Sequence, residues 1–132
     1  MIYTSYFGNM KKIRKEHPEI SLFSIAGKTP NWFLDFDKCY TYKTLAPKYE
    51  WWSEWHNRFG KDPESEESRE FYTRKYLETV LSKLNPHGVS TELKRVGGDD
   101  ICLLCYETKD KFCHRHLVSR WLKNNGIPSV EY

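Results

Sequence analysis

The chain has 132 residues, of which 39% are hydrophobic and 16% aromatic, and its formal net charge is +3. This length is typical of one domain with one core, and the composition excludes an intrinsically disordered chain. No stretch approaches the roughly 20 apolar residues that a membrane span requires. We therefore expect a single domain over residues 1–132 that is soluble and cytoplasmic and has no membrane partner. The mild charge permits an anionic ligand without demanding nucleic acid.

The N-terminal part of the sequence predicts two strands joined by a helix. IYTSYF and ISLFSIAG are β-rich runs that each end at a turn containing glycine. The basic segment between them, residues 9–19, is short and is predicted to be helical. The sequence thus indicates one β-α-β unit. The aromatic stretch over residues 31–49 is predicted to be a loop folded over one end of the sheet.

An aromatic stripe predicts the first helix in the middle of the chain. Trp51, Trp55 and Phe59 recur at four-residue spacing. We expect this helix to begin at Glu50 and to end at Gly60. Such stripes usually face a core. The tryptophans are therefore expected to contribute mainly to the fold.

Two further helices and a buried strand are predicted to follow. Apolar residues at positions 71–84 mark a longer helix, which we expect to stop at Asn85-Pro86. STELKRVGG predicts another helix with Ser90 as its N-cap. DICLLC is short and apolar throughout, as are strands buried on both faces of a parallel sheet. The expected fold class is α/β, a single three-layer domain with a small, mostly parallel sheet flanked by helices.

The segment CLLCYETKDKFCHRH, residues 102–116, contains three cysteines and two histidines and raises the question of a zinc site. The apolar pattern of the helix that follows turns His114 inward and His116 toward water. Two side chains two positions apart on a helix point about 200° apart. In a strand, Cys102 and Cys105 emerge on opposite faces. A four-ligand site built from this set is therefore not expected, so we predict no metal and no cofactor.

The remaining reactive residues lie where a strand ends and the last helix begins, which is where open α/β sheets bind ligands. Free N–H groups at a helix start favour anions and lower the pKa of a nearby thiol. We hypothesise that Cys113 is either a partly ionised thiol or a wall of an anion site, and that His114 relays protons. Glu107 would act as a base or orient a cation, and Arg115 would hold an anionic group. In the alternative, Glu107 pairs with Arg115 and the cysteines are merely small buried residues.

The same residues carry a resemblance to a known family. LLCYE followed by FCHRHLVSRWL, together with IYTSYF and YKTLAP, is similar to the bacterial and phage proteins of domain-of-unknown-function family 488. The resemblance implies a single small α/β domain. It also implies five signature positions, namely Cys105, Glu107, Cys113, His114 and Arg115. Many members have an Asp-Val-Arg strand end where this chain has SIAGKTP, and we expect Lys28 to supply the positive charge there.

The favoured function is binding of a small anionic or nucleotide-like ligand, with chemistry on that ligand as a further expectation. Its polar pocket is predicted where the strands near Tyr6, Gly27 and Cys105 end, and the expected ligand contacts are Tyr6, Lys28, Cys105 and Arg115. A nucleic-acid-binding module is the main alternative, because KKIRK is basic and several tryptophans, Trp32 among them, could stack on bases. A structural zinc-binding or non-catalytic interaction protein is the third interpretation.

Overall fold

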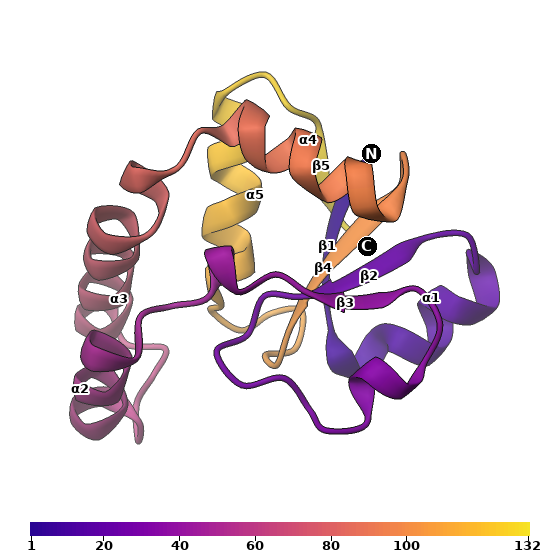
Figure 1. The fold of residues 1–132 in the computed structure, drawn as a ribbon. Coiled ribbons are helices and arrows are strands. Elements are labelled where there is room, and N and C mark those ends of the chain that lie inside the picture. The colour runs from indigo at the N-terminus through magenta and orange to yellow at the C-terminus, as the bar shows by residue number, and fades with distance from the viewer.

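A five-stranded parallel sheet forms the centre of the computed structural model, which describes residues 1–132 (Figure 1). Its strands are β1 (Ile2–Tyr6), β2 (Ser21–Ser24), β3 (Cys39–Thr41), β4 (Ile101–Cys105) and β5 (Ser129–Glu131). They lie in the order β3-β2-β4-β1-β5, and every neighbouring pair is parallel. The predicted α/β fold class with a small parallel sheet is therefore confirmed.

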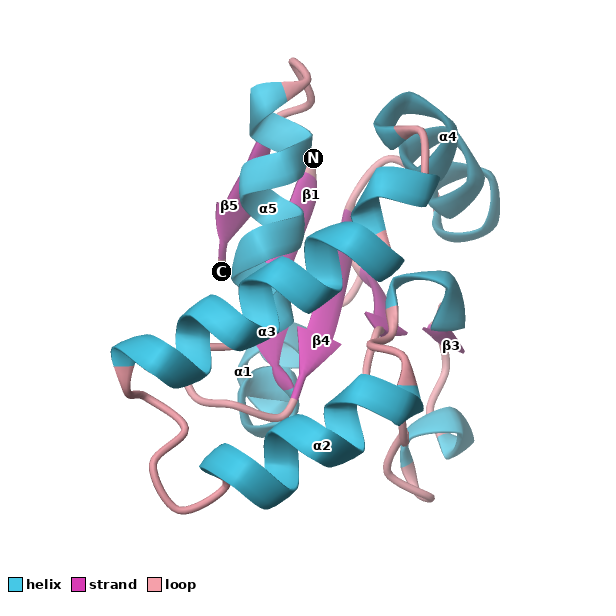
Figure 2. Ribbon diagram, turned by 90° about the vertical axis from the view of Figure 1, so that its left-hand side faces the viewer, coloured by secondary structure: helices cyan, strands magenta, loops and turns pink.

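Five α-helices surround the sheet: α1 (Met10–Glu16), α2 (Tyr49–Phe59), α3 (Glu66–Thr79), α4 (Pro86–Gly97) and α5 (His114–Asn124). The helix α1 covers one face, whereas α4 and α5 cover the other. Figure 2 shows α3 lying outside α5, and α2 packs against α3. None of these helices is long and apolar enough to cross a bilayer.

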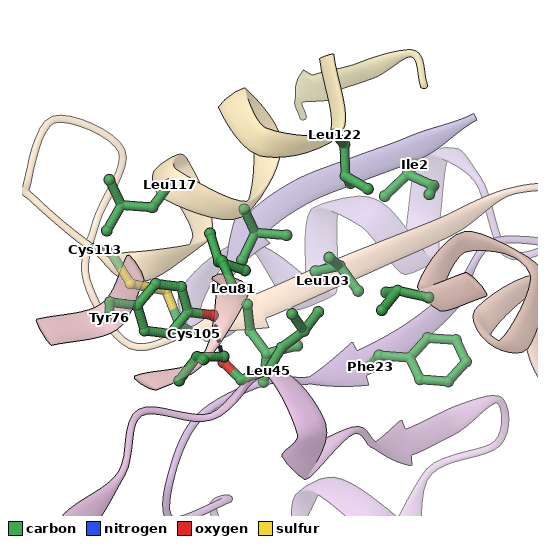
Figure 3. Close-up of a cluster of buried hydrophobic side chains, with 14 of the residues drawn as sticks. Ile2, Phe23, Leu45, Tyr76, Leu81, Leu103, Cys105, Cys113, Leu117 and Leu122 are labelled. Atoms are coloured by element: carbon green, nitrogen blue, oxygen red, sulfur yellow. Dashed lines mark hydrogen bonds between the residues drawn. A yellow bond between two sulfur atoms is a disulfide. The ribbon is translucent and has the colours of Figure 1, made fainter. Parts of the chain in front are cut away.

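The central strand β4 is buried on both faces, as its uninterrupted apolar sequence predicted. Because side chains alternate along a strand, Cys102 and Leu104 enter the core beneath α1. Ile101, Leu103 and Cys105 enter the larger core beneath α4 and α5 (Figure 3). The sequence-based expectation that Cys102 and Cys105 lie on opposite faces is thus confirmed. The aromatic stripe of α2 packs on the larger core, also as expected.

Two strands and one helix boundary differ from the sequence-based predictions. Residues 31–49, predicted to be a loop, contain the edge strand β3, and the edge strand β5 was not predicted. Asn85-Pro86 begins a helix instead of ending one. The Asn85 side chain accepts hydrogen bonds from the N–H groups of His87 at 2.9 Å and Gly88 at 3.2 Å, and proline needs no donor at the first helical position. Ser90 therefore lies inside α4.

The connections that follow the neighbouring strands β1 and β4 run toward opposite edges of the sheet. From β1 the chain crosses through α1 to β2, and from β4 it crosses through α5 to β5 on the other face. Open α/β sheets bind ligands at the carboxyl ends of the strands where such a reversal occurs. Tyr6 and Cys105 end β1 and β4 and are paired in register. These two residues mark this point of the sheet edge.

Candidate functional site

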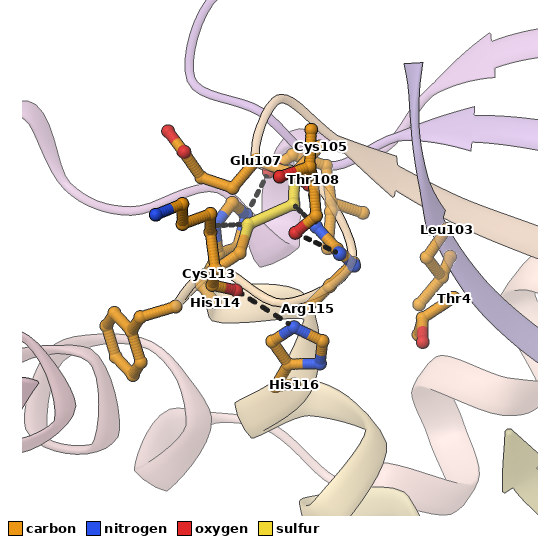
Figure 4. The surroundings of a disulfide bond; sticks show 12 residues. Thr4, Leu103, Cys105, Glu107, Thr108, Cys113, His114, Arg115 and His116 are labelled. Carbon is orange, nitrogen blue, oxygen red and sulfur yellow. Dashed lines mark hydrogen bonds between the residues drawn. A yellow bond between two sulfur atoms is a disulfide. The ribbon is translucent and has the colours of Figure 1, made fainter. Parts of the chain in front are cut away.

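A disulfide bond joins Cys105 and Cys113 at the centre of the site (Figure 4). Cys105 ends β4 and Cys113 is the N-cap of α5, and both side chains are buried. The expectation of a free thiol at Cys113 is therefore wrong in this state, and the free cysteines are Cys39 and Cys102. The loop between β4 and α5 turns back on itself and brings the two sulfurs together. The spacing of the two cysteines in the sequence does not show that the loop brings them into contact.

The Arg115 side chain is completely buried and is held by protein atoms on every side. Its Nε donates to both carboxylate oxygens of Glu131 at 3.2 Å, and its Nη2 donates to one of them at 3.1 Å. Its Nη1 donates to the backbone oxygen of Glu107 at 2.6 Å and to the sulfur of Cys105 at 3.1 Å. The backbone oxygen of Thr108 accepts from Nη2 at 3.2 Å. Arg115 therefore ties α5 to β5 and to the preceding loop, and it offers no free donor to a ligand.

The carboxylate that pairs with Arg115 belongs to Glu131 of β5, which the sequence analysis did not identify. Glu131 also accepts a hydrogen bond from the hydroxyl of Thr4 at 2.6 Å. The alternative interpretation, in which the Glu107 side chain pairs with Arg115, is wrong, because Glu107 contributes only its backbone oxygen and the residue is exposed. No pattern near residues 105–115 indicates Glu131, since β5 is short and lies beyond the next helix.

His114 faces the protein interior, as its helical phase predicted. Its Nε2 lies 2.7 Å from the backbone oxygen of Ile25, which can only accept, so Nε2 carries the proton. Its Nδ1 therefore presents a lone pair, and it lies 3.7 Å from the sulfur of Cys113. Burial lowers the pKa of His114 to about 4, so the ring is neutral at neutral pH. The rings of Tyr72 and Tyr76 pack beside it.

Three potential metal ligands meet at this point. The sulfurs of Cys105 and Cys113 and a ring nitrogen of His114 all lie within 4.8 Å of one another. The exclusion of Cys102 and His116 holds, since Cys102 belongs to the opposite core and His116 contacts the backbone oxygen of Lys111. The geometric argument from the sequence concerned a four-ligand site built from the whole set, and it did not address this group of three.

Two other predicted ligand contacts, Tyr6 and Lys28, lie at the end of β1 and just after β2. The guanidinium of Arg115 lies 5.8 Å from the centre of the Tyr6 ring. Lys28 follows β2 and is exposed. Its backbone oxygen accepts a hydrogen bond of 2.5 Å from the hydroxyl of Tyr106, the residue after Cys105. The chain segments that follow β2 and β4 are thus joined directly at the edge of the sheet.

Exposed aromatic rings gather at the same edge of the sheet. Trp32 is 47% exposed and Tyr106 is 52% exposed. Both pack edge-on against the buried ring of Phe7, with ring centres 6.5 and 4.9 Å away. We call Phe7, Trp32 and Tyr106 the aromatic platform. Its residues follow β1, β2 and β4, so the sequence analysis, which noted Trp32 alone, did not bring them together.

Two surface hollows lie away from these residues. One, of about 530 Å³, is an open depression on the outer face of α3. The other, of about 450 Å³, lies between β3 and α4 and is lined mainly by apolar side chains. Neither contains any of the predicted site residues.

Comparison with known proteins identifies the family. A family model described as the active DUF488-N3 subclade matches residues 25–126, which is more than half of the chain and includes both site cysteines. No curated protein and no solved structure matches the chain. The family match agrees with the resemblance of the LLCYE and FCHRH segments noted above. The chain therefore belongs to domain-of-unknown-function family 488, within its active DUF488-N3 subclade.

Proposed function

We propose that the protein binds a small anionic, nucleotide-like ligand at the carboxyl ends of β1, β2 and β4. The observation that carries this proposal is the aromatic platform, which lies beside Lys28. The platform is found where the connections after β1 and β4 run toward opposite edges of the sheet. Ligands of open α/β sheets bind at such points. The disulfide prevents Cys113 from acting as a nucleophile in this state. The proposal therefore concerns ligand binding, without a nucleophilic role for Cys113.

The aromatic platform suits the planar part of such a ligand. Trp32 and Tyr106 expose about half of their surfaces, and the buried Phe7 supports both rings. Stacking of a base on an aromatic side chain contributes about 1–3 kcal/mol. Such stacking tolerates different bases, because every base has a π-face. The platform thus favours a ligand with an aromatic ring without selecting one base.

The exposed ammonium of Lys28 suits the anionic part of the ligand. Arg115, which the sequence analysis placed in this role, is fully engaged with Glu131 and with backbone oxygens. Lys28 is the remaining predicted cation at this edge, and its backbone is joined to Tyr106 of the platform. An ammonium with free donors can receive a phosphate or a carboxylate. A ligand that stacks on Tyr106 would therefore place its anionic group near the positive charge of Lys28.

A small ligand is favoured over a nucleic acid because most of the tryptophan surface is occupied. Trp51 is buried, and Trp52 and Trp55 pack against the larger core. Trp32 is the tryptophan that remains substantially exposed. The net charge of +3 is also too small to imply an extended path for a phosphate backbone. These features support a compact site with one stacking platform.

Binding of adenosine monophosphate, measured by calorimetry and by quenching of tryptophan fluorescence, tests the proposal. Trp32→Leu and Tyr106→Leu should each weaken binding by about 5- to 150-fold, the equivalent of about 1–3 kcal/mol. Tyr49→Leu is the matched control, because Tyr49 is 72% exposed on α2, which forms no part of this edge. Lys28→Met should weaken binding, whereas Lys123→Met on the last turn of α5 should not.

Several results would contradict this proposal. Binding that is unchanged by both platform substitutions would show that the ligand does not stack there. An equal loss in the Tyr49→Leu control would indicate a nonspecific effect. Tight binding of an oligonucleotide whose affinity falls steeply with salt, with a slope near one per phosphate contact, would favour a nucleic-acid-binding module instead.

A further inference from the structure

Two sulfurs and an imidazole converge inside the protein. Cys105 ends β4, and Cys113 and His114 open α5. Their potential ligand atoms lie within 4.8 Å of one another, and all three residues are buried. Thiolates together with imidazole are the donor set that binds zinc and other thiophilic cations most readily. The cluster thus has the composition of a metal site.

The His114 ring is oriented as metal-binding histidines are. Its Nε2–H donates to the backbone oxygen of Ile25 at 2.7 Å. Histidines that bind metals usually donate their other ring N–H to a carbonyl or a carboxylate in this way, which fixes the tautomer and the ring plane. The lone pair of Nδ1 is consequently directed toward the sulfur of Cys113, 3.7 Å away. The ring needs no reorientation to act as a ligand.

The charges around the two sulfurs favour a divalent cation once the bond between them is reduced. Arg115 donates a hydrogen bond of 3.1 Å to the sulfur of Cys105, which supports a thiolate there. The positive charge of Arg115 is itself paired with Glu131. Two buried thiolates would therefore leave an excess of two negative charges. A divalent cation neutralises this excess, and the Arg115 donor then supports a metal-bound sulfur.

The backbone spacing leaves room for an ion between the cysteines. The Cα atoms of Cys105 and Cys113 lie 7.3 Å apart. Disulfides usually hold their Cα atoms about 4.4–6.8 Å apart. Zinc–sulfur bonds of about 2.3 Å in a tetrahedral site separate two sulfurs by about 3.8 Å. After reduction the sulfurs can reach this separation by rotation of their side chains, because the Cα atoms are already widely spaced.

We propose that Cys105, Cys113 and His114 form a three-ligand site for Zn²⁺ or a similar thiophilic cation in the reduced protein. A dithiol reductant supplies two electrons and two protons, breaks the sulfur–sulfur bond to give two thiols, and is itself oxidised to a disulfide. The cation then binds both sulfurs and the Nδ1 nitrogen, and the two thiol protons leave to solvent. The disulfide and the metal are therefore mutually exclusive. A site with three protein ligands leaves a fourth position open, as catalytic zinc sites do.

Titration with Co²⁺ tests this proposal, because thiolate-bound cobalt absorbs strongly in the near ultraviolet and tetrahedral cobalt absorbs in the visible range. The protein is reduced with a phosphine, desalted without oxygen and titrated beside the oxidised protein. The reduced protein should bind one Co²⁺ per chain with both absorptions, and the oxidised protein should show neither. Added Zn²⁺ should displace the cobalt.

Matched variants identify the ligands. Cys113→Ala should abolish the thiolate absorption, whereas Cys102→Ala should retain it, since Cys102 lies in the opposite core. His114→Gln should weaken binding by more than the roughly 10- to 100-fold that is typical for partners outside the ligand shell. His116→Gln should have no such effect, because His116 lies outside the cluster. Circular dichroism establishes that each variant is folded.

A measurement on the unaltered protein covers the case of a variant that does not fold. Zn²⁺ should protect Cys105 and Cys113 of the reduced protein from alkylation by iodoacetamide, and it should leave the rates at Cys39 and Cys102 unchanged. The proposal is wrong if the reduced protein shows no thiolate–cobalt absorption. It is also wrong if Zn²⁺ protects all four cysteines equally, or if Cys113→Ala binds cobalt as the unaltered protein does.

Discussion

Replacing Arg115 with methionine tests how strongly the buried ion pair stabilises the fold. Methionine keeps much of the length of the arginine stem and removes every donor. Glu131 then loses its cation, and the backbone oxygens of Glu107 and Thr108 lose their donor. The complete burial of Arg115 argues for a substantial loss of stability.

The expected magnitude follows from the surroundings of the pair. Removing one partner of a buried ion pair costs about 3–5 kcal/mol, because a charge remains buried without compensation. The Glu131 side chain is 21% exposed, so water reaches its carboxylate and reduces this cost. We therefore expect Arg115→Met to lower the free energy of unfolding by about 3 kcal/mol. Adding Glu131→Met removes the uncompensated charge and should recover about 1–2 kcal/mol of that loss.

Urea unfolding at pH 7, followed by circular dichroism, measures these changes in a double-mutant cycle. The disulfide is kept oxidised in all four proteins, and the dependence of the unfolding free energy on urea should stay constant across them. Two results would refute the reasoning. One is a loss below about 1 kcal/mol for Arg115→Met, and the other is a double variant whose loss equals the sum of the two single losses.

Three further predictions concern stability. The pKa of His114 is about 4 in the fold against 6.5 in the unfolded chain. The unfolded chain therefore binds the extra proton first as the pH falls. The unfolding free energy should then decrease between pH 6.5 and pH 4 by at most about 1.4 kcal/mol per pH unit. This decrease should be steeper than in His114→Gln. Gly97→Ala should cost about 1–3 kcal/mol, because its Cβ would meet a ring carbon at 2.7 Å, whereas Gly27→Ala meets nothing within 4 Å and should fold normally. Tyr76→Phe removes a buried 2.6 Å hydrogen bond to a backbone oxygen and should cost about 1–3 kcal/mol in thermal or urea unfolding, whereas the exposed Tyr49→Phe should cost nothing measurable.

The elements that could be predicted are those with a strong apolar pattern. The strand β4 reads as an unbroken apolar run, and α5 shows one apolar face, so both were identified. The strands β3 and β5 have three residues each and lie at the edges of the sheet. An edge strand packs on fewer neighbours and can carry residues such as Thr41 and Glu131. Its sequence therefore resembles that of a loop.

The helix start at Pro86 was misread for a different reason. Proline cannot occupy a helix interior, so it indicates a boundary without showing on which side the helix lies. Asn85 settles the question in the structure, because its side chain caps the free N–H groups of α4. An asparagine before a proline is a recognised helix start, and this signal was present in the sequence.

Local sequence patterns predicted only part of the candidate site. The position of Cys113 and the inward direction of His114 follow from strand and helix periodicity, and both agree with the structure. The disulfide, the pairing of Arg115 with Glu131 and the aromatic platform each depend on contacts between separate elements. Periodicity within one element carries no information on such contacts.

The central place of β4 also has a consequence for how the protein folds. The strands β1 and β2 are joined through α1 but do not pair with each other, because β4 lies between them. Ile2 and Ser21 both pair with Ile101, which the chain supplies only after α2, α3 and α4. The N-terminal β-α-β segment therefore cannot close a sheet by itself. Folding must first close a long loop, and parallel pairing of this kind is intrinsically slow. A fragment that ends before β4 should remain largely unstructured, and the whole domain should fold as one cooperative unit.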